Sequence, residues 1–574
     1  MTEEAALSPT ELVKLASHAL RGGLPEAVVS DAPSFSDSDA VLLKFHGIYQ
    51  QDDRDQRVKR GEEREPAWQL MIRLTIPGGI LTADQYLALD ALADRVGNGT
   101  LRATTRQSIQ FHGVHKGDVK LLLAEINGML LTTIAACGDV ARNVMASPAP
   151  IADDAHRAAQ RVAREIALEL RPQTSAYYEI WLDGERVTDS SSEEPLYGES
   201  YLPRKFKVGV ALDTDNAVDI YSYDCGLVAI TRDGAVLGYN LLVGGGFGIT
   251  HNKAATFARI ATPIAFVKAG NAVAAVRAVC ELYRDEGNRS DRRQARIKYL
   301  IEKWGVERFT NELRRRVTFA LESPVAVQEP VQRDYLGVAP QGDGRSFFGV
   351  FVQSGRIEDR NGTRTRMAFR EIVATVRPGI RLTPMQSVLF TDLTDADVLT
   401  VQRILDAHGV RRAAELSNTV RYSMACPALP TCGLALAESE RALPSVLDSI
   451  EKELQRLNLS DVPHTVRMTG CPNGCARPYN ADIGFVGRRP GVYHVFVGGG
   501  LSGNRLADLF AGDVAVDQIV PVLRPLFERF AAERQPGEGL GDFYQRVVGR
   551  ATPRHTLTGK EKPTSALFAA DELS

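Results

Sequence analysis

Four cysteines in the C-terminal third of the chain have the residue type and spacing of metal ligands. They form two close pairs, Cys426-x5-Cys432 and Cys471-x3-Cys475, with a much longer segment between the pairs. Thiolates are soft ligands that suit iron–sulfur clusters and zinc. Proline and glycine interrupt both loops, which allows the sulfurs to converge from several directions. The pattern predicts a thiolate-bound metal centre.

Other uses of these cysteines fit the spacing less well. Zinc ribbons usually contain shorter C-x2-C pairs, although a structural zinc site stays open. A radical-enzyme C-x3-C-x2-C motif would need a cysteine where Pro478 stands, and a thioredoxin-type C-x2-C pair is absent. Burial of the four as small apolar residues also stays open, and ordinary packing is the default for Cys137, Cys225 and Cys280.

The composition is that of an ordinary globular protein. The chain has 574 residues, 44% hydrophobic and 24% charged, with a net charge of −3. About 150 residues per domain suggests three or four domains, and the near-neutral balance does not favour nucleic acid or a membrane. The sequence shows neither a signal-peptide pattern nor a run of about 18 apolar residues. We expect a protein of the reducing cytoplasm, without a disulfide framework.

Hydrophobic periodicity predicts a small α/β layer behind a polar segment. Residues 1–66 are polar and charged and predict an extended or partly disordered arm with short ordered pieces. Strands are predicted at 68–76 and 101–113, and helices at 82–96, with Thr82 as N-cap, and at 117–130. This β-α-β-α order is typical of a compact α/β unit.

The second half of the chain repeats the first. At one common displacement along the chain, Arg102–Phe111 falls on Arg381–Phe390 and Arg142–Ala149 falls on Arg421–Ala428. At a slightly smaller displacement, the segment 239–246 (YNLLVGGG) falls on 493–500 (YHVFVGGG), so the first copy carries an insertion between these points. Three ordered blocks indicate a duplication.

The two halves differ chemically, because Cys426 falls opposite Ser147 and only the C-terminal half holds the four-cysteine set. We therefore predict a pseudo-twofold protein with one occupied site. The other half is expected to supply further groups to the same cavity.

The cysteine motifs resemble a known family. Ser423–Cys432 (SMACPALPTC) and Thr469–Cys475 (TGCPNGC) are similar to the sirohaem and 4Fe–4S site of nitrite and sulfite reductases, and the likeness runs from about Leu42 to Phe543. The motifs KFHG at 44–47, QDDRD at 51–55, YLPRKFK at 201–207 and GEGLGD at 537–542 are most similar to the haemoprotein (beta) subunits of the NADPH-dependent sulfite reductases.

The resemblance implies two cofactors. One 4Fe–4S cluster per subunit would be bound by Cys426, Cys432, Cys471 and Cys475, and Cys475 would also be the axial ligand of one sirohaem. Reduction of sulfite to sulfide takes six electrons, and a cluster beside the haem iron refills it without release of partly reduced sulfur. The protein supplies orientation, protons and charge.

The implied fold is α+β: a pseudo-twofold duplicated nitrite/sulfite reductase fold, in which two ferredoxin-like repeats pack together and two larger α+β domains enclose the sirohaem. The expected segments are an N-terminal arm at 1–66, repeats at 67–136 and 345–416, a sirohaem and substrate domain at 137–344, and a 4Fe–4S and sirohaem domain at 417–574.

Four basic residues match the family's substrate pocket: Arg73, Arg142, Lys205 and Lys207. Taken alone, Arg73 would be salt-bridged or solvated, and the two lysines would form an exposed strand face. The same spacing places two ammonium groups on one side, which a dianion can use. The resemblance implies that the four side chains grip sulfite oxygens and relay protons.

A second set of residues is implied to contact the sirohaem carboxylates. Arg102, Arg106, Gln110 and His112 share one face if 101–113 is a single strand, although a lone His112 would more often be a core histidine. Arg296, where close relatives often have lysine, lies in the basic run 287–298. Arginine keeps the positive charge there with a different geometry.

The glycine runs bear on the electron source. Gly498–Gly503 formally fits G-x-G-x-x-G, but the corresponding run Gly244–Ile249 lacks the last glycine, and no persuasive βαβ unit follows. We interpret both runs as tight backbone beside the macrocycle. The chain is therefore expected to lack NADPH and flavin modules, and a separate NADPH-dependent flavoprotein (alpha) subunit carrying FAD and FMN would donate electrons within a hetero-oligomer.

The leading hypothesis is an assimilatory sulfite reductase haemoprotein subunit that binds sulfite, with no nucleic-acid or membrane partner. A ferredoxin-dependent sulfite or nitrite reductase of the same fold is the alternative within the family. A non-catalytic binding protein stabilised by zinc or by a cluster is the alternative of another class. A visible spectrum separates the last from the others, because sirohaem and the cluster are coloured.

Overall fold

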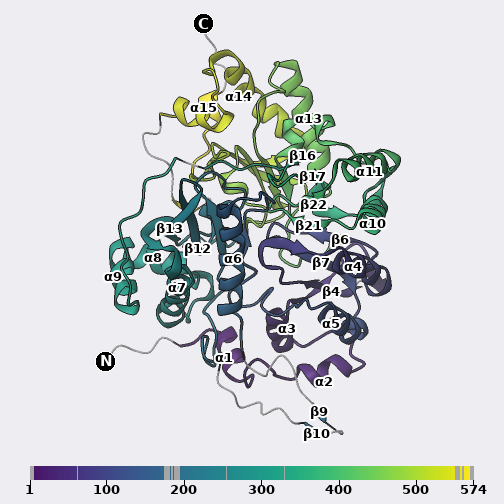
Figure 1. Cartoon of the computed structure of the whole chain (residues 1–574), viewed down its shortest axis with the longest axis vertical. Coiled ribbons are helices and arrows are strands. Elements are labelled where there is room, and N and C mark those ends of the chain that lie inside the picture. Colours follow the sequence, from purple (N-terminus) through teal and green to yellow (C-terminus); the bar gives the residue numbers. More distant parts are fainter. Residues whose placement is uncertain are drawn as a thin grey trace.

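The computed structural model describes residues 6–60, 63–173, 181–182, 185–186, 194–253, 255–328, 330–549, 556–558 and 561–568. The two ends of the chain, which belong to the first and last predicted segments, lie outside this set. Four five-stranded sheets form the body of the protein, two of them in a pair of small repeats and two in larger units (Figure 1).

The first repeat has the sheet order β1-β4-β7-β6-β18. Its strands are β1 (Ile48–Asp52), β4 (Trp68–Arg73), β6 (Leu101–Ala103) and β7 (Ile109–Val114), and its helices are α4 (Ala83–Val96) and α5 (Val119–Gly128). The helix predicted at 82–96 is confirmed. The Thr82 hydroxyl accepts the amide hydrogen of Gln85, and the Gln85 side chain accepts that of Thr82, so a capping box begins α4.

The prediction of one strand over 101–113 is wrong. Residues 104–108 form a turn, so β6 and β7 make an antiparallel hairpin in which Arg102 lies opposite Gln110. Gln107 has a positive φ of 50° in this turn. The alternating pattern did not reveal the turn, because Thr104–Ser108 has no glycine or proline.

The second repeat has the order β16-β17-β22-β21-β5. Its elements are β16 (Gly337–Pro340), β17 (Ser346–Val350), α10 (Thr365–Val376), β21 (Gly379–Leu382), β22 (Val388–Leu393) and α11 (Asp395–Ala407). The repeats exchange their fifth strands: β18 (Arg356–Ile357) pairs with β6, and β5 (Ile80–Leu81) pairs with β21. Because each sheet is completed by the other repeat, the two fold as one unit.

Two larger sheets follow the same plan, with orders β8-β11-β12-β13-β15 and β23-β24-β25-β26-β27. The first comprises β8 (Met145–Ala146), β11 (Val208–Leu212), β12 (Cys225–Arg232), β13 (Ala235–Val243) and β15 (Thr262–Lys268). The second comprises β23 (Ser423–Ala425), β24 (Val466–Thr469), β25 (Ile483–Arg489), β26 (Val492–Val497) and β27 (Asp508–Ala515). In both, the first three strands are parallel and the remaining pairs are antiparallel.

Strand register supports the duplication. Val208 pairs with Cys225 in the first large sheet, and Val466 pairs with Ile483 in the second. The same displacement along the chain therefore carries Val208 to Val466 and Cys225 to Ile483. The Lys207 amide donates to Asp224 Oδ2 at 2.9 Å, and at the same displacement the Thr465 amide donates to Asp482 Oδ2 at 2.8 Å. The predicted duplicated α+β architecture, with its two small repeats packed together, is confirmed.

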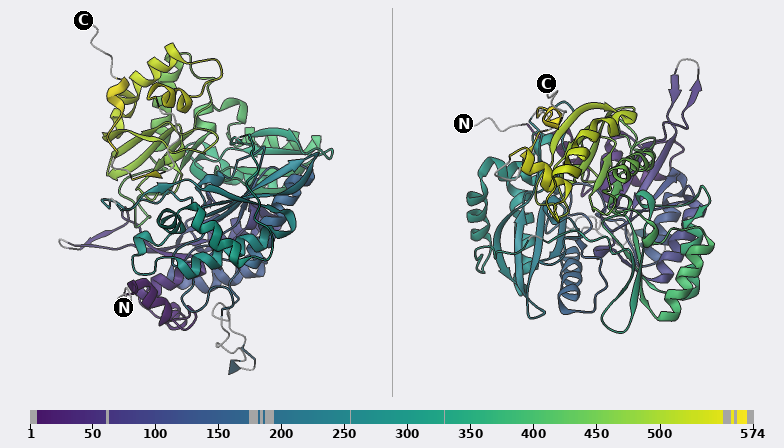
Figure 2. Two further views of the ribbon diagram at one scale, coloured as in Figure 1. Left: turned by 90° about the vertical axis from the view of Figure 1, so that its left-hand side faces the viewer. Right: turned by 90° about the horizontal axis from the view of Figure 1, so that it is seen from above.

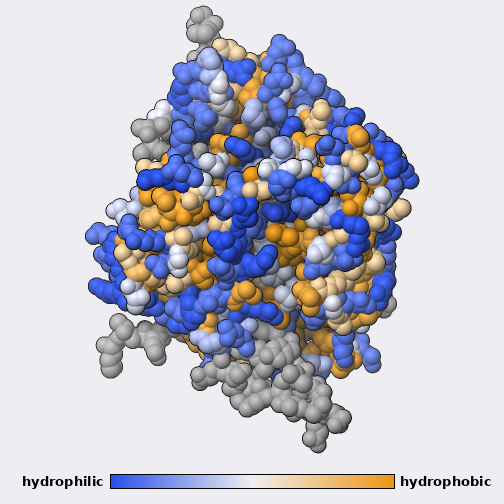
Figure 3. All heavy atoms as spheres, viewed as in Figure 1, coloured by the Kyte–Doolittle hydropathy of each residue, from blue (hydrophilic) through white to orange (hydrophobic). Residues whose placement is uncertain are grey.

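Helices cover the large sheets on their outer faces (Figures 1 and 2). They are α6 (Asp154–Glu169), α7 (Ala272–Glu286), α8 (Ile297–Trp304) and α9 (Val306–Arg316) for the first sheet, and α13 (Leu443–Arg456), α14 (Ile519–Glu533) and α15 (Leu540–Val547) for the second. Within the described part of the chain, no helix is long and apolar enough to cross a membrane. Figure 3 shows polar and apolar side chains interspersed over the viewed face.

The N-terminal segment is more ordered than its composition indicated. It forms helices α1 (Pro9–Leu15), α2 (Leu24–Val29) and α3 (Asp37–Leu43), and then β1, which joins the first sheet. Leu20, Leu42, Phe45 and Ile48 are buried in the core that the repeats share with the first large sheet. A few apolar residues at the right spacing were sufficient to dock an otherwise polar stretch.

Candidate functional site

The four cysteines lie on two loops that meet at one sheet edge. Cys426 directly follows β23, and Cys471 lies two residues after β24; the two strands are parallel neighbours, so their carboxyl ends are adjacent. Cys432 and Cys475 lie further along the same loops. Cys426 and Cys471 are buried, Cys432 is half-buried and Cys475 is exposed. The Gly470 amide donates to Cys426 Sγ at 3.4 Å.

The thiols are close enough to influence one another. Burial raises the pKa of Cys426, Cys432 and Cys471, that of Cys471 to about 12, and the neighbouring Cys475 raises all three further. In the described residues no group of three or more His, Cys, Asp or Glu side chains is arranged around a single metal ion. The donor set is thiol only, as in the cysteine-bound 4Fe–4S clusters, and metal binding would deprotonate all four.

Basic residues converge from the other half of the molecule. Arg73 ends β4 opposite Gln110 of β7, which in turn lies opposite Arg102 of β6, so the three side chains form a row on one sheet face. The Gln110 amide, oriented with its oxygen toward Arg73, accepts from Nε at 3.0 Å and Nη2 at 2.5 Å. Burial lowers the pKa of Arg73, but Cys137, Tyr49 and Cys475 together raise it. Arg73 therefore lies within electrostatic range of Cys475.

Arg142, Lys205 and Lys207 are joined by a short backbone bridge. The Arg142 amide donates to the Phe206 carbonyl at 2.8 Å, which brings Arg142 beside both lysines. Burial lowers the pKa of Lys205 to about 7, with Arg204, Arg296 and Arg142 adding to the shift and Cys475 opposing it. Burial and Lys205 place the pKa of Lys207 well below its usual value. A desolvated cluster of cations is a site that favours an anion.

Arg106 carries unpaired hydrogen-bond donors into this region. Its Nη2 donates to the Asn143 carbonyl, whereas its buried Nε and Nη1 have no hydrogen-bond partner in the described structure. Burial lowers its pKa to about 10, which still leaves it charged at neutral pH. A buried guanidinium with two nitrogens whose N–H groups are unpaired fits carboxylate oxygens, and sirohaem carries eight carboxylates. The residues present therefore fit this cofactor.

His112 and Arg102 lie on the same sheet face as Gln110. His112 Nε2 is buried without a hydrogen-bond partner among the described residues, and burial together with Arg356 lowers the pKa of His112 well below the usual value. Arg102 is committed to the protein, donating through Nη2 to the carbonyls of Ser354 at 2.8 Å and Ala425 at 2.9 Å. The structure thus ties Arg102 to the strand that precedes Cys426.

Arg296 is already paired. Its Nε and Nη2 donate to the Asp224 carboxylate at 2.9 and 2.6 Å, and Asp224 also accepts from the Lys207 amide. The structure brings Arg296 to the pocket wall, where it braces the Lys207 strand. Lys298 reaches the same wall and donates to the Gly246 and Gly248 carbonyls at 3.1 and 2.8 Å.

The glycine runs pack tightly against equivalent loops. A Cβ at Gly245 would meet the carbonyls of Tyr221 and Tyr223 at 2.4 Å, and one at Gly499 would meet the Asn480 carbonyl at 2.3 Å. Only glycine permits this approach. The glycine runs follow β13 and β26. These contacts agree with the prediction that the runs form tightly packed backbone.

Sequence reasoning missed two neighbours of the basic cluster. Cys137 was given a packing role, but Arg73 Nη1 donates to its Sγ at 3.2 Å. Burial and Cys137 raise the pKa of Tyr49, which lies near Arg142 and Arg73. Neither residue belongs to a repeated block, so the sequence held no signal for their position. Cys225 and Cys280 are buried packing residues, as predicted.

Comparison with known proteins shows the family. The model of the nitrite and sulphite reductase 4Fe-4S domain matches residues 162–321 and 417–547, and that of the nitrite/sulfite reductase ferredoxin-like half domain matches 63–129 and 338–408. The chain therefore belongs to the nitrite and sulphite reductase family.

Two relatives are equally similar. The sulfite reductase (NADPH) hemoprotein beta-component of Methylorubrum populi is 45% identical over 550 residues, covering 95% of this chain and 90% of the relative. The sulfite reductase (ferredoxin) of Synechococcus elongatus is 45% identical over 562 residues, covering 94% and 89%. The solved structure of the Mycobacterium tuberculosis NirA protein, 24% identical, has the same fold, with a TM-score of 0.77 over 95% of this chain and 97% of that one.

Proposed function

We propose that this chain is the haemoprotein of an assimilatory sulfite reductase, which reduces sulfite to hydrogen sulfide with six electrons. The observation that carries the proposal is the convergence of a buried cation cluster on Cys475, the one exposed thiol of a four-cysteine set. Relatives named sulfite reductase, of which the chain covers about nine tenths, support it.

The proposed cofactors are one 4Fe–4S cluster and one sirohaem per chain. Cys426, Cys432, Cys471 and Cys475 would hold the cluster, with Cys475 shared with the sirohaem, and the unpaired N–H groups of Arg106 would bind a sirohaem carboxylate. His112 would contact the same cofactor assembly, Arg102 and Gln110 would brace its sheet face, and Arg296 would act through Asp224. When bound, these cofactors store electrons and deliver them to the substrate.

The protein's own groups would bind the substrate and move protons. Arg73 and Arg142 would attract the oxygens of sulfite through their positive charge, while Gln110 and Cys137 hold Arg73 and the Gly138 carbonyl holds Arg142 Nε at 2.8 Å. Lys205, with a pKa of about 7, can hold or release a proton at Nζ near neutral pH, and Lys207 lies beside it. As an S–O bond breaks, protons from these groups would convert the leaving oxygen into water.

The proposed electron donor is a separate NADPH-dependent flavoprotein carrying FAD and FMN, in a hetero-oligomer within the cytoplasm. A ferredoxin donor is the second candidate, because the ferredoxin-type relative is as similar as the NADPH-type one. The proposed segments of the chain follow the sequence prediction: an arm, two repeats and two larger domains with boundaries at 66/67, 136/137, 344/345 and 416/417.

The test compares turnover of sulfite and nitrite by the loaded protein, first with a chemical reductant and then with each donor. Sulfite should be reduced to sulfide with the higher kcat/KM. Preference for nitrite would replace the proposal by a nitrite reductase, and a colourless protein without turnover would favour the non-catalytic alternative.

A further inference from the structure

Asp219 and Arg477 occupy equivalent positions in the two halves. They are related by the same displacement along the chain that relates the strands of the large sheets. Each precedes a short 3-10 turn, Ile220–Ser222 and Pro478–Asn480, and each has a left-handed backbone, with φ and ψ of 60° and 56° at Asp219 and 57° and 51° at Arg477. The duplicated position thus kept its strained backbone but acquired opposite charges.

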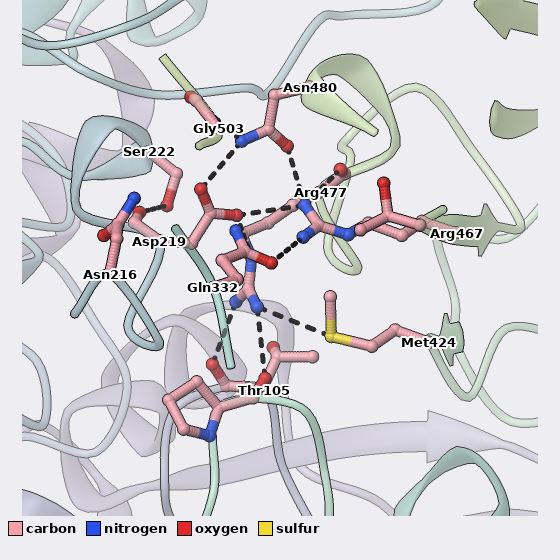
Figure 4. Close-up of polar contacts among 12 residues, drawn as sticks. Thr105, Asn216, Asp219, Ser222, Gln332, Met424, Arg467, Arg477, Asn480 and Gly503 are labelled. Carbon is pink, nitrogen blue, oxygen red and sulfur yellow. Dashed lines mark hydrogen bonds and ion pairs between the residues drawn. The ribbon is translucent and has the colours of Figure 1, made fainter. Parts of the chain in front are cut away.

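The two side chains contact each other across the molecule (Figure 4). Arg477 Nε lies 2.6 Å from Asp219 Oδ2, and the side chains are 6% and 0% exposed. Asp219 also accepts from Asn480 Nδ2 at 2.7 Å and lies 3.0 Å from Arg467 Nη1, which is fully buried. Two guanidinium groups share one carboxylate, so removal of Asp219 would leave two buried cations without their counter-charge, whereas removal of Arg477 would leave the Asp219–Arg467 pair.

Arg477 lies only two residues after Cys475 and anchors that loop. Its Nη1 donates to the Thr105 carbonyl at 3.2 Å and its Nη2 to the Pro384 carbonyl at 3.1 Å, so it reaches both small repeats. The Thr105 hydroxyl in turn donates to the Cys475 carbonyl at 3.3 Å. The Cys475 loop is therefore fastened to the turn that carries Arg106.

We propose that the Asp219–Arg477 pair is the positioning element of the shared thiolate: it holds the Cys471–Arg477 loop on the Thr104–Ser108 turn, so that Cys475 faces the basic pocket. The role of Cys475 as a shared ligand rests on the proposed function, whereas the anchoring rests on the contacts above. Arg477 acts through Cys475 and touches no substrate.

The test measures hydrogen–deuterium exchange of the loop amides at 473–477 in cofactor-free protein, together with cofactor content after reconstitution. In Arg477→Met we expect exchange of this loop to rise at least about tenfold, while that of α7 and α14 stays unchanged. The ratio of sirohaem to acid-labile sulfide should fall, because the cluster keeps its four thiols but the shared ligand is misplaced.

Arg421→Met is the matched control. Arg421 also forms an arginine–aspartate pair, with Nε donating to Asp334 Oδ2 at 2.7 Å, but in the described structure that pair does not reach the Cys475 loop. It should leave loop exchange and cofactor ratio as in the wild type. If the Asp219–Arg477 pair only stabilised the fold, Arg477→Met and Arg421→Met would both lower the melting temperature, and neither would raise hydrogen exchange selectively at 473–477.

Two milder variants test the proposal even if Arg477→Met does not fold. Thr105→Val removes only the hydrogen bond to the Cys475 carbonyl, and Arg477→Lys keeps the charge; both should give intermediate exchange. Wild-type exchange at 473–477 in folded Arg477 and Thr105 variants would overturn the proposal. If wild-type protein binds neither cofactor while the variants free the loop, the proposed function fails and the anchoring stands.

Discussion

The two halves of this protein have the same strand register but different chemistry. Val208 and Val466 begin equivalent strands, and the amides of Lys207 and Thr465 bind equivalent aspartates. At the same displacements, however, Cys426 corresponds to Ser147 and Cys475 to Ala217. One half supplies thiols and the other supplies cations, so a duplicated scaffold places unlike groups on either side of one site.

In the N-terminal half, the positions equivalent to these two cysteines are occupied by residues that hydrogen-bond to a shared carboxylate. Ser147 Oγ donates to Asp215 at 2.5 Å, and the Ala217 amide donates to the same carboxylate at 2.8 Å. Tyr335, from the segment between the halves, also bonds to Asp215. The buried polar groups at this position are therefore satisfied by protein partners.

The largest expected effect comes from the thiol half. Cys475→Ser should abolish sirohaem and cluster absorption and lower sulfite reduction at least about a thousandfold, the size of loss seen when an essential group is removed. Visible spectroscopy and steady-state kinetics measure it. Cys280→Ala, a buried cysteine of α7, is the control and should cost only about 1 kcal/mol of stability while retaining both absorptions. A fully loaded, active Cys475→Ser protein would contradict the comparison.

Substitution of the equivalent arginines Arg142 and Arg421 should have very different effects on sulfite reduction. Arg142→Met removes a cation of the basic pocket and should lower kcat/KM for sulfite by about 10²- to 10³-fold, as loss of a positioned charge does in other enzymes. Its counterpart Arg421 pairs with Asp334 and should tolerate the same change. Kinetics with a chemical reductant would refute the asymmetry if both variants lost equal activity.

Lys205 predicts a pH dependence of stability in the cofactor-free protein. The pKa of Lys205 falls from 10.5 to about 7 on folding, so between these pH values the unfolded chain binds more protons than the folded protein. The destabilisation of the fold by Lys205 is therefore complete below pH 7 and fades as the pH rises toward 10.5. Lys205→Met should raise the free energy of unfolding by up to about 4 kcal/mol at pH 7 and by about 1 kcal/mol at pH 9.5.

Denaturant melts of the exposed Lys253→Met variant provide the control for that measurement, and its stability should match the wild type at both pH values. A Lys205→Met stabilisation that is equal at pH 7 and 9.5 would show that burial of charge is not the cause.

The smallest expected effect concerns helix caps that the two repeats do not share. Thr82 and Thr394 form capping boxes at α4 and α11, but the displacement that relates the repeats places α4 on α10 and α5 on α11. Each change to alanine should lower the free energy of unfolding by about 1 kcal/mol, because one helical amide loses its acceptor. A thermal melt in which only one variant is destabilised would show that the two repeats are not equally coupled to the fold.

Sequence alone predicted the duplication and the α4 helix, because repeated blocks and helical periodicity can be found in the sequence; the cysteine ligand set stays a prediction. It did not predict the exchange of β5 and β18 between repeats, since two-residue strands carry no periodicity. It also missed the turn between β6 and β7, and the commitment of Arg102 and Arg296 to protein partners. Such pairings join residues that are far apart along the chain, and only the folded chain brings them together.

We infer that the duplicated chain holds one redox site, on the cysteine half, facing cations from the other half. Counting iron, acid-labile sulfide and sirohaem in the purified protein tests it most directly. One 4Fe–4S cluster and one sirohaem per chain, with absorption of both, is the predicted result. Zinc in place of iron, or sulfide for a second cluster, would contradict it.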